Sequence, residues 1–254
     1  MTLFDWMGLL NTIALITPIF TILISRLPLY KSFPILLFYY AILFIYNFLN
    51  LGYIQVSKDL LYYLGTFCNL MDPPLMLLFM SYFSQTASFR KKLYIVAAGF
   101  VAFEILIVAI YGFTTKASTI VLAPGFAMVI CLALIFFIHQ VKIAVVHHKA
   151  IGKAIMSTSV LFAYVGYAFV YTVYYIIESP QTADTYLIYF LITIASSISM
   201  STGIFFERHR VKKLDELKTT RKELKDVYGS SKDEKKTTPP YGKVALNFDN
   251  DQWS

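Results

Sequence analysis

Charged residues are scarce in this 254-residue sequence, where Asp, Glu, Lys and Arg make up 15%, against roughly 25% in a typical soluble domain. They are also unevenly spread, because only sixteen of them fall within the first 206 residues. A stretch of that length with so few charges cannot cover its surface with polar groups in water. The composition therefore excludes an ordinary soluble protein and predicts a chain embedded in lipid.

Cysteine and the residues of known catalytic motifs are scarce as well. Both cysteines, Cys68 and Cys131, fall inside apolar stretches, so a disulfide framework is not expected. The histidines do not form the inward-facing set of a metal-dependent membrane hydrolase; they are His139, His147, His148 and His209. Phosphate-binding glycine loops and nucleophile elbows are missing too. We therefore expect no cofactor, no metal and no enzymatic activity.

Hydrophobic residues make up 57% of the sequence, and they fall into seven apolar segments long enough to cross roughly 30 Å of hydrocarbon. The expected spans are Met7–Leu27, Pro34–Gln55, Leu60–Ser84, Leu93–Phe113, Ser118–His139, Ala154–Ile177 and Thr185–Phe206. Lipid offers the backbone no hydrogen-bond partners, so each span should be a helix. The predicted fold is an all-α, seven-helix transmembrane bundle. The seventh span contains no lysine, which excludes a covalently bound retinal there.

The short loops differ in their content of Lys and Arg. Before the tail, one side of the expected bundle carries eight of these residues and the other carries only Lys58 and Lys116. The positive-inside rule therefore predicts an N-terminus outside and a basic C-terminal tail in the cytoplasm. No basic residue precedes the first span, which argues against a cleaved signal peptide. We expect a multi-pass protein of the plasma (inner) membrane, whose basic charge meets lipid head groups and not nucleic acid.

Two carboxylates lie inside expected spans, Asp72 near the middle of the third and Glu104 in the fourth. A carboxylate at the membrane centre costs about 3 kcal/mol, so each should face protein or water. Pro73 and Pro74 also lack the N–H groups that would bond the carbonyls one turn earlier, including that of Asn69. This pattern predicts a ligand or ion site around Asp72. The alternative is a bent helix whose Asp72 simply bonds a neighbouring Tyr or Asn.

Polar residues recur at helical spacing in the second, sixth and seventh spans, which predicts a polar cavity between helices two, three, six and seven. The candidate ligand-binding residues are Asp72, Asn69, Glu104, Asn50, Tyr46, Tyr167, Tyr171 and Ser196. Other interpretations stay open, because small residues in the seventh span also permit close packing. Tyrosines near span ends are also common interface anchors.

The sequence after the last span predicts a helix over residues 207–228, followed by a disordered tail over 229–254. Leu214, Leu217 and Leu224 fit heptad positions, with Arg221 interrupting the seam. The helix is expected either to lie on anionic lipid or to form a stalk that pairs with a second copy or a partner. Alternating apolar residues between Tyr241 and Phe248 suggest a docking segment for a cytoplasmic partner, the alternative being a plain disordered terminus.

One run of residues resembles a known family. Leu61-Tyr62-Tyr63-Leu64-Gly65, Pro73-Pro74-Leu75, Tyr82 and the basic loop at Arg90 are similar to the seven-helix sensory region of bacterial histidine kinases. The resemblance implies an input module whose last helix runs into a cytoplasmic signalling domain. Here about 48 residues follow the seventh span, too few for a kinase domain, so any signal would leave through the tail to a partner.

Three functions fit these observations. The leading expectation is a non-enzymatic membrane sensor or adaptor that binds a small or lipid-like ligand and signals through its cytoplasmic tail. The second is a small transporter or channel that uses Asp72 and Glu104 along a pathway. The third is an assembly factor for a membrane complex, which needs no pocket at all.

Overall fold

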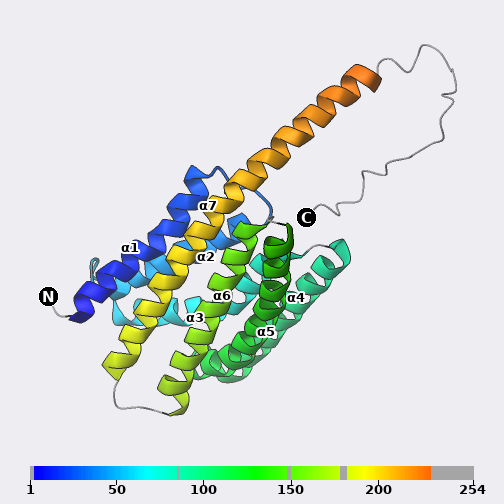
Figure 1. Ribbon diagram of the computed structural model, residues 1–254. Helices are drawn as coiled ribbons and strands as arrows, with labels where there is room; N and C mark the ends of the chain where they lie inside the picture. The colour runs from blue at the N-terminus through cyan, green and yellow to red at the C-terminus, as the bar shows by residue number, and fades with distance from the viewer. Residues whose placement is uncertain (1–2, 85, 148–149, 178–181, 230–254) are drawn as a thin grey trace.

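The computed structural model describes residues 3–84, 86–147, 150–177 and 182–229 (Figure 1). Seven α-helices and two short turns make up almost all of this part, and no strand occurs in it. The elements are α1 Leu3–Ile24, α2 Phe33–Asn50, α3 Lys58–Met80, the 3-10 turn η1 Ser81–Phe83, α4 Ala87–Tyr111, α5 Thr115–His147, α6 Ile151–Tyr171, the π-helical turn η2 Thr172–Ile176 and α7 Thr182–Gly229. The all-α prediction is confirmed, and each expected span overlaps one of the seven helices.

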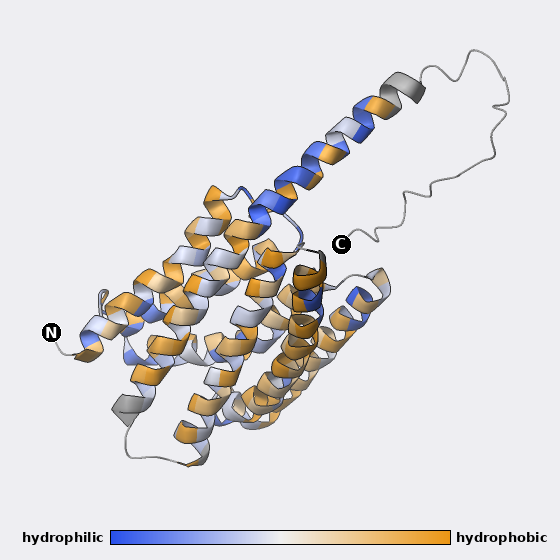
Figure 2. Ribbon diagram, viewed as in Figure 1, coloured by the Kyte–Doolittle hydropathy of each residue, from blue (hydrophilic) through white to orange (hydrophobic). Residues whose placement is uncertain are grey.

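Six of these helices, all except α3, are long and apolar enough to cross a membrane. Figure 2 shows apolar residues along the helices of the bundle, and large apolar side chains such as Phe20, Ile105 and Ile135 are exposed on its surface. Such a surface is stable only against hydrocarbon. The chain is therefore an integral, multi-pass membrane protein. α3 is long enough to span, but Asn69, Asp72 and its two prolines lower its hydropathy.

The helices form a closed ring with one helix outside it. α7 packs against α1 and α6, and the ring continues from α6 through α5, α3 and α2 back to α1. α4 packs mainly on α3 and α5, on the outside of the ring. The less apolar α3 is thus covered by α2, α4 and α5, which is how the bundle shelters its polar residues from lipid.

α7 runs through the bundle and far beyond it as one uninterrupted helix of 48 residues. We call the end of the bundle from which it leaves the exit end (Figure 1). The predicted boundary between bundle and tail helix lies one residue before Glu207, which is fully buried inside the bundle. Beyond Val211 and Leu214, which are half-buried, the residues whose side chains are described are exposed. Residues 230–254, including the predicted docking segment, lie outside the described residues.

Near the exit end, α6 and α7 cross in close backbone contact. A Cβ atom added to Gly152 would lie 2.6 Å from the backbone N of Glu207 and 2.7 Å from the carbonyl O of Gly203. A Cβ added to Gly203 would meet the Met156 backbone N at 2.9 Å. Only glycine permits this separation. The two glycines therefore hold α7 against α6 one turn before it leaves the bundle.

Candidate functional site

Asp72 lies in the middle of α3, and its carboxylate faces the interior of the ring. The Tyr164 hydroxyl, on α6, donates to Asp72 Oδ1 at 2.7 Å and also lies 3.4 Å from the Asp72 carbonyl O. The Tyr39 hydroxyl, on α2, is a second hydrogen-bond partner of the carboxylate. α3 remains helical through Pro73 and Pro74. Three helices thus meet at one carboxylate, which is the hydrogen-bonded arrangement that the simpler sequence interpretation expected.

Beside Asp72, α6 and α7 contribute a second layer of polar contacts. The hydroxyls of Tyr167 and Thr193 lie 3.2 Å apart, and the Ser159 hydroxyl donates to the Ser196 carbonyl O at 2.6 Å. Together with Tyr39, Asp72 and Tyr164, these four residues form what we call the core cluster.

The cavity at the core cluster is small. The space open to the centre of a water molecule is ≈ 10 Å³, and its walls include Tyr39, Tyr164, Tyr167 and Ser196. A volume of roughly 10–15 Å³ on this measure is needed for one water. In this conformation the cluster therefore holds no ligand larger than a water molecule, and a larger ligand must open it.

Several predicted site residues lie away from the core cluster. Asn50 is exposed at the last position of α2. Tyr46 packs on α3, where a Cβ added to Gly65 would touch its hydroxyl at 3.0 Å. Asn69 is half-buried, and no hydrogen bond joins its side chain to Asp72 within the described residues. Tyr171 donates to the Thr119 carbonyl O on α5 at 2.9 Å. None of these four side chains shares a hydrogen bond with the core cluster within the described part of the chain; a shared helix face does not fix the depth at which two helices meet.

Glu104 is also separate from the core cluster. It lies on α4, outside the ring, and is 4% exposed. Its Oε1 has no hydrogen-bond partner among the described residues, and no ion pair or hydrogen bond there links it to Asp72. Of the eight predicted site residues, the structure brings together Asp72, Tyr167 and Ser196.

Sequence reasoning missed a polar clamp between α1 and α2. The amide Nδ2 of Asn47 donates to the Thr12 hydroxyl at 2.7 Å, and the amide Nδ2 of Asn11 donates to Asn47 Oδ1 at 3.2 Å. All three residues are buried. Asn11 and Thr12 in the first apolar span were the available signal, since polar residues in a span usually find partners on a neighbouring helix.

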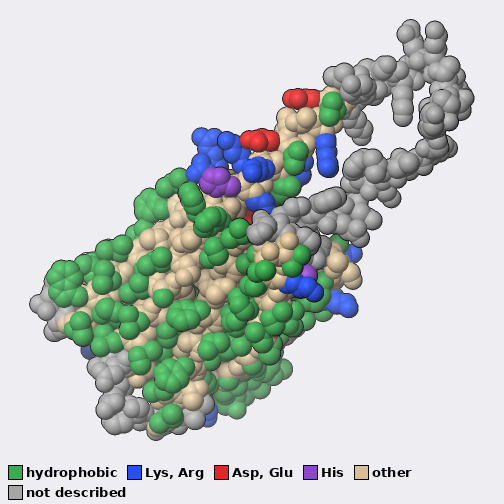
Figure 3. Space-filling view, in the orientation of Figure 1, with side chains coloured by type: hydrophobic (Ala, Val, Ile, Leu, Met, Phe, Trp, Pro, Cys, Tyr) green, Lys and Arg blue, Asp and Glu red, His purple; other side chains and the backbone are tan. Residues whose placement is uncertain are grey.

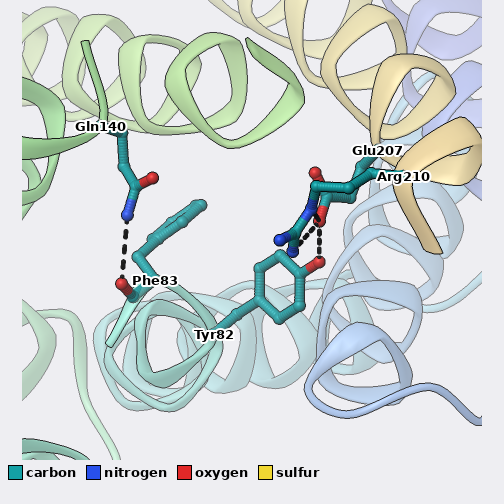
Figure 4. A network of polar contacts seen from close by, with 5 residues as sticks. All are labelled: Tyr82, Phe83, Gln140, Glu207 and Arg210. Carbon is teal, nitrogen blue, oxygen red and sulfur yellow. Dashed lines mark hydrogen bonds and ion pairs between the residues drawn. The ribbon is translucent and has the colours of Figure 1, made fainter. Parts of the chain in front are cut away.

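The exit end holds a second polar assembly, centred on the turn η1 that ends α3. Each residue of this turn is bonded to a different helix. The hydroxyls of Ser81 and Ser32, the residue before α2, lie 3.0 Å apart, and Ser81 also donates to the Tyr94 hydroxyl of α4 at 3.3 Å. The Phe83 carbonyl O accepts from Gln140 Nε2 of α5 at 3.2 Å (Figure 4).

Tyr82 joins η1 to α7. Its hydroxyl donates to Oε1 of Glu207, and the same oxygen accepts from Arg210 Nε at 2.8 Å (Figure 4). The Lys153 ammonium of α6 lies 5.2 Å from the centre of the Tyr82 ring, a cation–π distance. We call Ser81, Tyr82, Phe83 and these bonded partners the exit hub. It connects α2, α4, α5, α6 and α7 to the end of α3.

The connection between α1 and α2 covers the exit hub. The Tyr30 ring packs edge-on against the Tyr82 ring, with centroids 6.4 Å apart, and against Phe33. Burial raises the pKa of the Tyr30 hydroxyl above its ordinary value. The sequence signal for this hub was the pair Glu207 and Arg210, three residues apart on a helix and able to bond each other.

Comparisons with known proteins give no relative: no protein-family model, curated protein or solved structure matches the chain. The resemblance to the sensory region of histidine kinases therefore stays a prediction. The features that bear on function are the core cluster, the exit hub and the helices that connect them.

Proposed function

We propose that this chain is a non-enzymatic, seven-helix membrane sensor that carries a change at its core cluster to a helix projecting from the membrane. The observation that carries the proposal is the Tyr82–Glu207 hydrogen bond. It ties the end of α3, the helix that holds Asp72, to α7 where α7 leaves the bundle. With the N-terminus outside, as the loop charges predict, the exit end and the projecting helix are cytoplasmic.

The route from input to output follows α3. Asp72 and Tyr82 are ten residues apart, about 15 Å along a helix, and Pro73 and Pro74 lie between them. Each proline lacks one backbone hydrogen bond, so this part of α3 bends more easily than a regular helix. A small or lipid-like ligand that displaces Tyr164 or Tyr39 from Asp72 would favour a different bend, by as much as its affinities for the two states differ.

α7 supplies a second, direct connection. Its bundle-facing residues Thr193, Ser196, Met200 and Glu207 are buried, and the same face continues beyond the bundle as Leu214, Leu217 and Leu224 at heptad spacing. A single rigid element thus reaches from the core cluster to the projecting helix.

The output partner is inferred to be another protein. Two copies anchored in one membrane would pair their projecting helices in parallel and in register, which places Arg221 against Arg221 in the seam. Leu217 and Leu224 are 56% and 50% exposed and form an apolar stripe beside Lys218 and Lys222. An amphipathic helix with acidic flanks complements this stripe better than a second copy does.

The transporter alternative is less well supported. Among the described residues no contact links Asp72 to Glu104, and the cavity at the core cluster holds about one water molecule, which gives a transport pathway little support. Flux across proteoliposomes would decide in favour of transport. An assembly factor would use the projecting helix without the core cluster, so Asp72 would be dispensable.

Distance measurements between the bundle and the projecting helix test the sensor. Spin labels at Lys142→Cys and Thr219→Cys, in a full-length chain with both native cysteines replaced and reconstituted in nanodiscs, report the position of α7. Asp72→Asn should shift or broaden the distance distribution, and Tyr82→Phe should broaden it further. Asn50→Ala, an exposed control, should leave it unchanged. Identical distributions for Asp72→Asn and the parent chain would reject the relay.

A further inference from the structure

Lys153, the third residue of α6, is an unusual lysine because it is only 5% exposed. Its ammonium stands over the Tyr82 ring, and no carboxylate, carbonyl or hydroxyl of the described residues accepts a hydrogen bond from it. Glu207, the nearby carboxylate, bonds Arg210 and Tyr82 through Oε1, and its Oε2 has no hydrogen-bond partner among the described residues. A buried ammonium is costly unless an anion accompanies it.

Further cations lie around Lys153. Arg210 of α7, Lys31 of the α1–α2 connection and Arg90 of α4 all lie close enough to repel its charge, and Glu207 is the one carboxylate that acts on it. Figure 3 shows Lys and Arg side chains gathered at this end, around the base of the projecting helix. Arg210 and Glu207 offset each other as an ion pair, so the charges of Lys153 and Arg90 add to a positive field that a multiply charged anion would neutralise.

The start of α6 adds to this environment. α6 begins at Ile151 after Ala150, which has a φ of 60° and supplies no side-chain hydrogen bond as a cap. The N–H groups of a first turn point out of the helix end, where the helix dipole also favours negative charge. Lys153 lies in this first turn. The Lys153 charge and the helix dipole therefore favour an anion at the same end of α6.

We propose that the exit end binds a phosphate group, with Lys153 as its central donor and Arg210, Arg90 and the first turn of α6 around it. A phosphate monoester carries close to two negative charges at pH 7 and several acceptor oxygens, which match a set of separate donors. The phosphate belongs either to an anionic lipid head group or to a soluble phosphate ester. This site goes beyond the proposed sensor function, because its occupancy can be measured without any signalling assay.

Thermal unfolding of the purified full-length chain in a non-ionic detergent tests the site. The probes are phosphatidic acid and diacylglycerol, which differ only by the phosphate, and inorganic phosphate compared with sodium chloride at equal ionic strength. The unfolding temperature of the parent chain should rise by several degrees with phosphatidic acid or with inorganic phosphate. A rise with phosphatidic acid alone assigns the site to lipid, and a rise with both assigns it to a soluble anion.

Two lysines of the exit end serve as a matched pair of variants. Lys153→Gln should abolish the rise, whereas Lys142→Gln, at an exposed position of α5, should keep it in full, as should Lys153→Arg. An equal rise in Lys153→Gln, or no rise in the parent chain with any probe, would overturn the proposal. If Lys153→Gln does not fold, Arg90→Gln provides the readout: it should weaken phosphate binding several-fold, and unchanged binding would equally reject the site.

Discussion

The core cluster and the exit hub are both polar assemblies inside an apolar bundle, but they are built differently. The core cluster joins four helices through hydroxyl groups and one half-buried carboxylate, around a cavity of about one water. The exit hub joins α2, α4, α5, α6 and α7 to the end of α3. At its centre lies Glu207, a fully buried carboxylate that bonds both Arg210 and Tyr82 through one oxygen. A hydroxyl group can exchange one hydrogen-bond partner for another at little cost in free energy. Separating a buried ion pair costs much more, because each charge is left without its partner.

In the proposed sensor, this difference gives the two regions separate roles. The core cluster is the part that a ligand can rearrange, because each of its hydrogen bonds contributes about 0.6 kcal/mol in a membrane. The exit hub is the part that holds one geometry and passes movement of α3 to α7. The following four substitutions challenge this division, beginning with the one expected to have the largest effect.

Glu207→Ala should lower the free energy of unfolding by about 3 kcal/mol, because it leaves the Arg210 cation and the Tyr82 hydroxyl without their shared partner. Thermal unfolding in detergent, followed by circular dichroism, measures the loss. Glu216→Ala is the control: Glu216 pairs with Lys212 at 3.9 Å, but both side chains are largely exposed, and such a pair contributes almost nothing. Equal effects of the two substitutions would show that the exit hub is not a stabilising centre.

Gly152→Ala should cost about 2 kcal/mol, since the new methyl group meets the backbone of α7, which cannot yield as a side chain can. Gly99→Ala in α4 is the comparison, because nothing lies within 4 Å of the added Cβ, and alanine is the better helix former there. The unfolding temperature should fall for the first and stay level or rise for the second. An unchanged unfolding temperature in Gly152→Ala would mean that α6 and α7 can move apart to accommodate the methyl group.

Tyr164→Phe should cost about 1 kcal/mol, because the ring still packs on Phe126 while the donor to Asp72 is lost. Its effect on stability should be smaller than that of Glu207→Ala, but its effect on the distance between α5 and the projecting helix should be comparable. Tyr63→Phe, at an exposed tyrosine, controls for loss of a hydroxyl as such. A Tyr164→Phe chain with unchanged distances would remove the core cluster from the relay.

The smallest effect is expected for Asn50→Ala, which should change stability by less than about 0.5 kcal/mol because the side chain is exposed. Asn47→Ala, three residues earlier, should cost about 1 kcal/mol, since it breaks both contacts of the α1–α2 clamp. The pair is compared in the same unfolding assay. A larger loss for Asn50 would restore it to the candidate site.

The sequence predicts the helices well because hydrocarbon imposes a strong and simple condition on each of them. Lipid requires an uninterrupted apolar helix of about 20 residues, and six of the seven helices satisfy this condition. The same rule predicted that Asp72 must face a partner, and Tyr164 and Tyr39 supply one. α3 is the exception: polar residues lower its hydropathy, and neighbouring helices cover it.

The exit hub was not predictable in the same way. Glu207 follows Phe206 and opens a charged stretch, so it reads as the first residue outside the membrane. Its burial depends on the glycine crossing of α6 and α7 and on Tyr82 at the end of α3, residues 125 positions away. Helical periodicity orders residues around one axis, but it does not say which depths of two helices meet. For the same reason the sequence did not indicate that Asn50 lies exposed at the end of α2.

The straight continuation of α7 has a mechanical consequence. The 19 residues after Arg210 form an arm of about 28 Å at 1.5 Å per residue, with the glycine crossing as its fulcrum. A tilt of about 10° at that fulcrum would displace the tip sideways by about 5 Å, roughly half the distance between the axes of two packed helices. A small change of tilt inside the bundle would thus be enough to bring the arm into contact with a neighbouring helix or to separate the two.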